Sequence, residues 1–138
     1  MRPEVASLDL ARCLAYKSLM LESMLLIAGA YFWGGVPTTY LMARYRIGVD
    51  LRAFGSGNVG ASNLAMLAGT RAGFISGIID SIGKGTLPVL LVEALGQNLY
   101  VQGGVGIAAV VGHNWSPYIG FSGGRGVATA FGAVLGLY

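Results

Sequence analysis

The sequence predicts an all-α, polytopic membrane protein of about three to five transmembrane helices joined by glycine-rich cytoplasmic loops. Only 11% of the 138 residues are charged, 54% are hydrophobic, and the mean hydropathy is +0.65. Soluble domains average about 25% charged residues, so this composition favours a lipid environment. The length predicts a single membrane-embedded domain, residues 1–138.

Charge and residue counts exclude several classes of protein. The net charge of +3 comes from cations beside the apolar runs rather than from a nucleic-acid-binding patch. Cys13 is the only cysteine and His113 the only histidine, which excludes an internal disulfide, a thiolate metal cluster and a two-histidine mechanism. No A-x-A-like cleavage site follows the N-terminal charges, so no cleaved targeting peptide is predicted.

The first apolar run long enough to span a bilayer is Leu19–Met42, since a helix needs about 20 residues to cross the hydrocarbon core. Before it, residues 1–17 mix charges with short apolar pieces and predict an interfacial or poorly ordered lead-in, which makes residues 1–18 an N-terminal extension. Three glycines near the end of the run predict close helix packing, and Pro37 predicts a kink.

Three arginines, Arg44, Arg46 and Arg52, follow this run directly. The positive-inside rule therefore places the next loop on the cytoplasmic side. Further cations before residue 18 weaken this assignment, although acidic residues are interleaved with them.

The loop itself, Gly55–Asn63, reads GSGNVGASN. Glycines permit backbone with positive φ and let main-chain N–H groups converge on an anion, and serine and asparagine side chains add further donors. A phosphate site and a flexible surface loop are both compatible with this composition. The G-x-G-x-x-G pattern within it is not a dinucleotide fingerprint, because the preceding residues 44–52 are too charged for a buried parallel strand.

The second apolar run, Gly73–Leu95, contains Asp80 and Lys84. Charged residues inside a membrane segment are costly unless they pair or line a polar cavity, so this pair predicts a polar interior. The alternative is that one helix ends near Ser81 and another begins at Pro88.

The last third of the chain contains a third apolar run, Tyr100–Val111, and a final one, Val127–Tyr138. Between them, residues 113–118 are predicted to be interfacial because Trp and Tyr favour the headgroup level. The segment Phe121–Thr129 is a second glycine-rich turn with Arg125 at its centre. A turn that places an arginine before a helix N-terminus predicts another phosphate site. The end at Tyr138, within an apolar run, indicates truncation.

Taken together, the segments 48–52, 55–63, 112–113, 120–121 and 123–130, with Pro117, resemble the acyl-phosphate-dependent glycerol-3-phosphate acyltransferases of bacterial membranes, over a match from about Ala28 to the C-terminus. The resemblance implies a multi-pass enzyme of the bacterial cytoplasmic (inner) membrane, acting in phospholipid biosynthesis. It would move a fatty acyl group from acyl phosphate to the 1-hydroxyl of glycerol 3-phosphate, giving lysophosphatidic acid. The resemblance implies no metal, coenzyme A, acyl carrier protein or other cofactor, and no nucleic-acid partner.

The resemblance also assigns site residues. Ser56 matches the required motif serine, here interpreted as a positioning group because no base is placed to make it an acyl-enzyme nucleophile. The phosphate-binding residues it implies are Gly55, Gly57, Asn58, Gly60, Asn63, Gly123, Gly124, Arg125 and Gly126. The supporting residues are Arg52, Asp80, Lys84 and His113.

Four departures from the family pattern lie in or near the loops. Ser62 replaces the usual threonine, Ser122 replaces a lysine, and Arg125 keeps the charge of the lysine that it replaces. Met66 stands where the family carries an arginine important for activity.

Two further departures concern the rest of the chain. One extra residue separates Asp80 from Lys84, and the family's third motif, a C-terminal segment with His and Asn, is absent. His113 belongs to the second motif and cannot replace the histidine of the third. These departures favour one alternative to the enzyme, a non-catalytic phosphate-ester-binding or regulatory module. A small transporter or channel using Asp80 and Lys84 in a polar path is a third alternative, against which the motif match argues. Acyl-chain preference and oligomeric state are not predicted.

Overall fold

The computed structural model describes the backbone of residues 3–138 and the side-chain surroundings of residues 12–138. Seven α-helices follow one another in this part of the chain: α1 (Pro3–Gly35), α2 (Thr38–Ile47), α3 (Ala61–Ala68), α4 (Thr70–Ile78), α5 (Leu87–Ala94), α6 (Leu99–Asn114) and α7 (Val127–Gly136). A π-helical segment, Ile79–Thr86, joins α4 to α5, and short 3₁₀ turns lie at Leu51–Ala53 and Pro117–Ile119. No strand occurs among residues 3–138, where Ser116 and Ser122 form an isolated bridge. The all-α prediction is confirmed.

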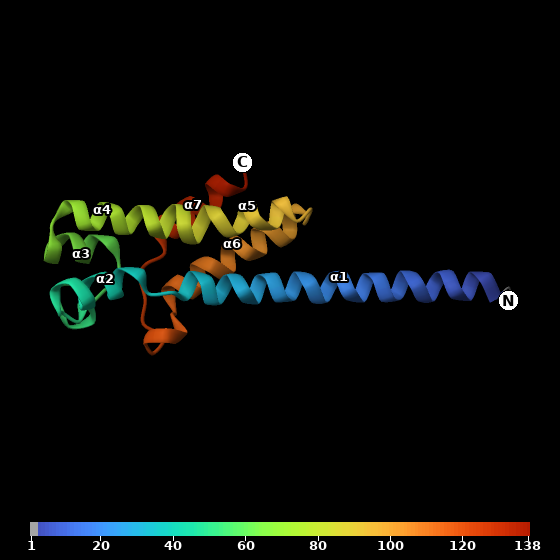
Figure 1. The fold of residues 1–138 in the computed structure, drawn as a ribbon, viewed down its shortest axis with the longest axis horizontal. Coiled ribbons are helices and arrows are strands. Elements are labelled where there is room, and N and C mark those ends of the chain that lie inside the picture. Colours follow the sequence, from blue (N-terminus) through green and yellow to red (C-terminus); the bar gives the residue numbers. More distant parts are fainter. Residues whose placement is uncertain (1–2) are drawn as a thin grey trace.

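Helix α1 is a single element of 33 residues. At 1.5 Å per residue it is about 50 Å long, which exceeds the hydrocarbon core of about 30 Å. Its N-terminal part extends past the other helices (Figure 1). Residues 3–17, predicted to be an interfacial or poorly ordered lead-in, are helical and continuous with the first span, so the expectation of poor order is wrong for them. Residues 1 and 2 lie outside the described part.

The predicted kink at Pro37 is a complete break. Helix α1 ends at Gly35, and α2 starts anew at Thr38 with Leu41 N donating to Pro37 O at 2.9 Å. Proline removes a helical donor and its ring crowds the preceding turn, so the chain cannot continue one helix through this point. Helix α2 ends at Ile47 and is followed by Gly48, which caps it in a left-handed conformation with φ of 78°.

Helices α4 and α5 form one uninterrupted run, Thr70–Ala94, through the π-helical segment. The alternative of a helix ending near Ser81 is wrong. Figure 1 shows this run lying antiparallel to α1. By length and composition, the run and the stretch Arg12–Ile47 are both able to cross a membrane, as the first two predicted spans require.

The π-helical segment contains the extra residue that separates Asp80 from Lys84. A π-turn is closed by an i→i+5 hydrogen bond and so takes up one more residue than an α-turn. The insertion therefore widens the helix locally and does not end it.

Glycines bring the helices into close contact. A Cβ on Gly34 of α1 would lie 2.1 Å from the carbonyl oxygen of Ala109 in α6, and one on Gly132 of α7 would lie 1.8 Å from that of Ser81. Close backbone approach through small residues is the usual means of helix association in lipid. The buried core around these contacts is also built of small side chains: Ala30, Val89, Val92, Val105 and Ala133.

The last two helices lie close to the predicted apolar runs. Helix α6 begins at Leu99, where Asn98 caps it by accepting from Tyr100 N and Val101 N. His113, the first residue of the segment predicted to be interfacial, lies in the last turn of α6 and is 8% exposed, so its side chain is covered by the protein. Trp115 and Tyr118, by contrast, are exposed.

Candidate active site

The first glycine-rich loop is held in shape by one buried side chain. The Nδ2 of Asn63 donates to three carbonyl oxygens, those of Leu51 at 3.1 Å, Phe54 at 2.8 Å and Asn58 at 3.0 Å. Its Oδ1 accepts from Ser56 N at 3.3 Å. Asn63 is 1% exposed, so these bonds replace water for the loop backbone. The predicted binding residue Asn63 therefore orders the loop from within.

The two glycines beside Ser56 turn the loop outward. Gly55 and Gly57 have φ of 56° and 70°, which disfavour other residues, and a Cβ on Gly55 would lie 2.4 Å from Asn63 Oδ1. Ser56 is exposed at the tip, and its Oγ accepts from Asn58 N at 3.4 Å. The hydroxyl hydrogen of Ser56 therefore remains available to a ligand.

The second glycine-rich turn packs directly on His113. Gly124 N donates to His113 O at 3.1 Å, and a Cβ on Gly124 would lie 2.1 Å from His113 Nε2. A Cβ on Gly123 would lie 2.1 Å from the His113 carbonyl oxygen. Only glycine fits at these two positions. Gly126, with φ of 71°, then starts α7, and Arg125 remains exposed.

The two glycine-rich loops are in direct contact. Val59 N donates to Gly123 O at 3.2 Å, which joins the first loop to the second across more than sixty residues of sequence. Helices α3 and α7 begin directly after Gly60 and Gly126, so both N-termini open into the same region. Helix N-termini present free N–H groups and favour anions.

A cavity of about 940 Å³ lies where these elements converge. Its polar end is lined by Ser56, Asn58, Ser62, Asn63 and Arg125. Its apolar wall is lined by Met66, Phe74, Ile78, Ile82, Phe131 and Leu135. Asp80 and His113 also reach this cavity. An amphiphile with an anionic head and a hydrocarbon tail matches this lining.

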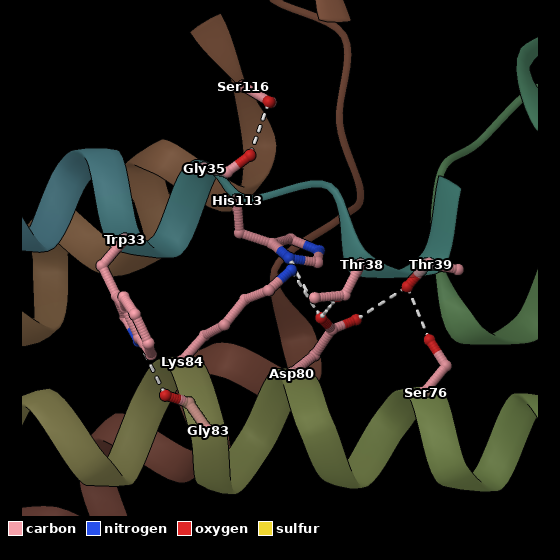
Figure 2. A network of polar contacts seen from close by, with 10 residues as sticks. All are labelled: Trp33, Gly35, Thr38, Thr39, Ser76, Asp80, Gly83, Lys84, His113 and Ser116. Atoms are coloured by element: carbon pink, nitrogen blue, oxygen red, sulfur yellow. Dashed lines mark hydrogen bonds and ion pairs between the residues drawn. The ribbon is translucent and has the colours of Figure 1, made fainter. Parts of the chain in front are cut away.

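Behind the cavity lies a buried polar network, drawn in Figure 2. Lys84 Nζ lies 2.7 Å from Asp80 Oδ1, and His113 Nδ1 lies 3.8 Å from the same oxygen. Thr38 Oγ1 donates to Asp80 Oδ1 at 3.1 Å and Thr39 Oγ1 to Oδ2 at 3.2 Å. Pairing and hydrogen bonding compensate the cost of burying these charges.

This network confirms the predicted polar interior. Because Asp80 and Lys84 are buried and bonded to each other, they do not form an open ion path, which argues against the transporter alternative. Among the residues that the structure describes, no group of three His, Cys, Asp or Glu is arranged to hold a metal ion.

Arg52, expected as a supporting cation, is engaged elsewhere. Its Nη2 lies 2.7 Å from Asp50 Oδ2, its guanidinium stacks 5.1 Å from the Tyr40 ring centroid, and Nη1 donates to Ile119 O. Hydrogen bonds from Arg52 lower the pKa of Asp50 to about 2, and the same pairing raises the pKa of Arg52. The residues that line the cavity include Arg125 but not Arg52.

Three residues of the network were missed by sequence reasoning: Thr38, Thr39 and Ser76. Thr39 Oγ1 and Ser76 Oγ are 2.5 Å apart, and both side chains are buried. Small hydroxyl residues are common in apolar runs, so only their placement opposite an intramembrane carboxylate could have identified them.

Comparisons with known proteins agree with this geometry. The sequence model of the family described as glycerol-3-phosphate acyltransferase matches residues 24–138. The chain is 48% identical over 109 residues to glycerol-3-phosphate acyltransferase 5 of Dehalococcoides mccartyi, covering 79% of this chain and 46% of the relative. It is 42% identical over 119 residues to the glycerol-3-phosphate acyltransferase of Synechococcus sp. strain CC9902, covering 86% and 59%.

A solved structure is also similar. The crystal structure of PlsY (YgiH), an integral membrane glycerol 3-phosphate acyltransferase in its glycerol 3-phosphate form, superposes with a TM-score of 0.77 at 38% identity. The match covers 84% of this chain and 57% of that one. The chain thus spans about half the length of the relatives it matches. On fold, loops and sequence, this chain belongs to the glycerol-3-phosphate acyltransferase family.

Proposed function

We propose that this chain carries the phosphate-binding part of an acyltransferase site, at which a fatty acyl group passes from acyl phosphate to the 1-hydroxyl of glycerol 3-phosphate. The observation that carries the proposal is the junction of the two glycine-rich loops at one cavity, joined by the bond from Val59 N to Gly123 O. Two helix N-termini and Arg125 there favour phosphate esters.

In this reaction the 1-hydroxyl oxygen attacks the acyl carbonyl carbon. The bond between that carbon and the phosphate oxygen breaks, phosphate leaves and takes up the hydroxyl proton, and lysophosphatidic acid remains. Acyl phosphate is already activated, so catalysis needs mainly orientation and stabilisation of developing charge. Ser56 orients the acceptor, loop N–H groups and Arg125 bind phosphate oxygens, and no resident cofactor is needed.

The apolar wall accommodates the acyl chain. Phe74, Ile78 and Ile82 recur at every fourth residue on one side of the cavity, and Phe131 and Leu135 do so on α7. Eight residues of helix correspond to a stripe about 12 Å long. Such a stripe holds an extended hydrocarbon segment beside the polar end.

The site faces the cytoplasm in a bacterial inner membrane. The observation behind this placement is the group of arginines in the last turn of α2 and just after it, Arg44, Arg46 and Arg52, which the positive-inside rule assigns to the cytoplasmic side. Thiol labelling of Ser56→Cys and Arg125→Cys, two exposed positions in the two loops, in a Cys13-free background tests the sidedness. Labelling of the two positions from opposite faces contradicts it.

A second function is favoured by Met66, which lines the cavity and is 70% exposed. Its thioether cannot supply the charge-assisted hydrogen bonds of an arginine. Each such bond is worth about 1.5–3 kcal/mol, which corresponds to roughly a ten- to hundredfold change in rate. On this alternative the chain binds phosphate esters without turning them over.

The deciding experiment uses the purified chain in lipid with acyl phosphate and glycerol 3-phosphate, and follows both binding and lysophosphatidic acid. We expect measurable binding and weak or absent turnover, with both reduced about tenfold in Ser56→Ala. Ser18→Ala, an exposed serine of α1 that bonds Ala15 O, is the matched control. Binding without turnover supports the binding module, and absence of both contradicts the proposed site.

A further inference from the structure

The carbonyl of Gly83 has lost its donor within the helix. Through the π-helical segment, hydrogen bonds run from residue i+5 to residue i, and Leu87 N donates to Ile82 O in this way. In the same register the partner of Gly83 O is residue 88. That residue is Pro88, which has no N–H. The oxygen therefore needs a donor from outside its own helix, since an unpaired carbonyl is costly in an apolar environment.

Trp33 supplies this donor from α1. Its indole Nε1 donates to Gly83 O at 2.8 Å, a contact between residues fifty positions apart (Figure 2). The bond ties the last turns of α1 to the point where the helix is widened. Phe32, the neighbouring exposed aromatic residue, contains no polar atom that could do the same.

The opposite side of the widened segment is braced by α7. A Cβ on Gly132 would lie 1.8 Å from Ser81 O, and one on Gly85 would lie 2.3 Å from Thr129 O. Thr86 Oγ1 also donates to Gly132 O at 2.8 Å. With α7 closely packed on one side, the bond from Trp33 fixes the segment on the other.

The widened segment carries the buried ion pair. Asp80 and Lys84 both lie within it, four residues apart, with their charged atoms 2.7 Å apart. Asp80 in turn reaches the cavity and contacts His113, on which the second glycine-rich turn rests. The shape of this segment thus sets where the polar network meets the cavity.

We propose that Trp33 is a positioning residue: its indole replaces the N–H that Pro88 lacks, holds the π-helical segment in shape, and so places Asp80 and Lys84 behind the cavity. Trp33 itself does not line the cavity. The proposal holds for the fold whether or not the chain turns over substrate, and its consequence for ligand binding rests on the proposed function.

The test is a double-mutant cycle between Trp33→Phe and Pro88→Ala, measured as the thermal unfolding midpoint of the full chain in detergent. Phenylalanine keeps the ring but not the donor, and alanine restores an N–H at position 88 that can satisfy the helix. We expect Trp33→Phe to lower the midpoint by about 3–5 °C in the parent and by about 1 °C or less in the Pro88→Ala background.

Two matched controls separate this role from general packing. Phe32→Leu alters an adjacent exposed aromatic residue, and Leu90→Ala alters α5 without adding a donor. Neither substitution is expected to change the amount by which Trp33→Phe lowers the unfolding midpoint. The proposal is overturned if Trp33→Phe lowers the unfolding midpoint equally in the parent and in the Pro88→Ala background, or if Trp33→Phe fails to fold in both backgrounds. If Trp33→Phe folds only when Pro88→Ala is also present, the proposal is supported.

Binding of glycerol 3-phosphate provides the readout that a merely stabilising contact would not move. We expect Trp33→Phe to weaken binding about three- to tenfold at a temperature where all variants are folded, and Pro88→Ala to restore it. If restored stability is not accompanied by restored binding, the positioning role is wrong. If the parent binds no phosphate ester, the proposed function fails, and the unfolding cycle still decides whether Trp33 replaces the missing donor.

Discussion

The two glycine-rich loops meet at one cavity but are held by opposite means. The first is organised by a side chain, since Asn63 satisfies three carbonyls of the loop. The second is organised by the absence of side chains, since Gly123 and Gly124 lie against His113 with no room for a Cβ. The two loops have similar compositions but should tolerate different substitutions. The first loop depends on the amide group of Asn63, and the second depends on the space left by glycines that have no side chain.

The loops also differ in charge. Arg125 of the second loop lines the cavity, whereas Arg52, ahead of the first loop, is paired with Asp50. Met66, which follows the first loop in α3, adds no charge. The first loop thus offers neutral donors, and the second offers neutral donors together with a cation.

The largest effect is expected from Gly124→Ala, which breaks the second loop. The new Cβ would lie 2.1 Å from His113 Nε2, so the loop or the buried histidine must move. We expect binding of glycerol 3-phosphate, measured by calorimetry, to weaken about 100-fold or more. Gly29→Ala on α1, where a Cβ meets nothing within 4 Å, is the control. If Gly124→Ala binds nearly as well as the parent, the absence of a side chain at this position is not what sets the shape of the loop.

A somewhat smaller effect is expected from Asn63→Ala, which breaks the first loop by leaving three carbonyls without their donor. We expect the free energy of unfolding to fall by about 3 kcal/mol and binding to weaken about 30-fold. Asn63→Asp keeps the acceptor and loses the donors, so its loss should be similar. An aspartate variant that binds like the parent contradicts the assigned role of Nδ2.

The difference in charge between the two loops is tested by Met66→Arg, which adds a cation at the cavity beside the first loop. One charge-assisted contact with a phosphate oxygen should tighten binding of glycerol 3-phosphate about tenfold, and any turnover should rise with it. Met66→Leu, which adds no charge, should bind like the parent. If the arginine variant binds no more tightly, the polar end of the cavity is not where phosphate is held.

The smallest effect concerns the Asp50–Arg52 pair. The pKa of Asp50 falls from 3.8 to about 2, so the carboxylate stabilises the fold above pH 3.8 and loses this contribution as pH falls through about 2. The stability difference between the parent and Asp50→Asn should be constant from neutral pH to about pH 4 and disappear by about pH 2, as followed by chemical denaturation. Because the pair is exposed, the difference should be small.

The same substitution tests whether Arg52 is remote from the ligand. Releasing Arg52 should change binding of glycerol 3-phosphate by less than about twofold, because Arg52 does not line the cavity. A marked gain on Asp50→Asn would instead place Arg52 at the site and remove the charge difference between the loops.

Several features of this protein are determined by the sequence alone, because they follow from local composition. Apolar runs too long for a soluble domain of this size predict helices in lipid, and glycine-rich stretches between them predict turns with free N–H groups. The pairing of Asp80 with Lys84 is also predictable, since two unpaired charges in an apolar run are too costly to persist.

Other features were decided by tertiary structure, because they depend on which groups meet across long distances in sequence. Sequence cannot show that Asp50 neutralises Arg52 while Arg125 remains exposed at the cavity, or that His113 is buried beneath a glycine turn. Nor can it show that an extra residue before Pro88 is accommodated in a π-helical segment, or that the indole of Trp33 donates a hydrogen bond to the carbonyl of Gly83 there. These outcomes depend on packing, since α1 and α7 close on the widened helix from both sides and supply partners that its own neighbours in sequence lack.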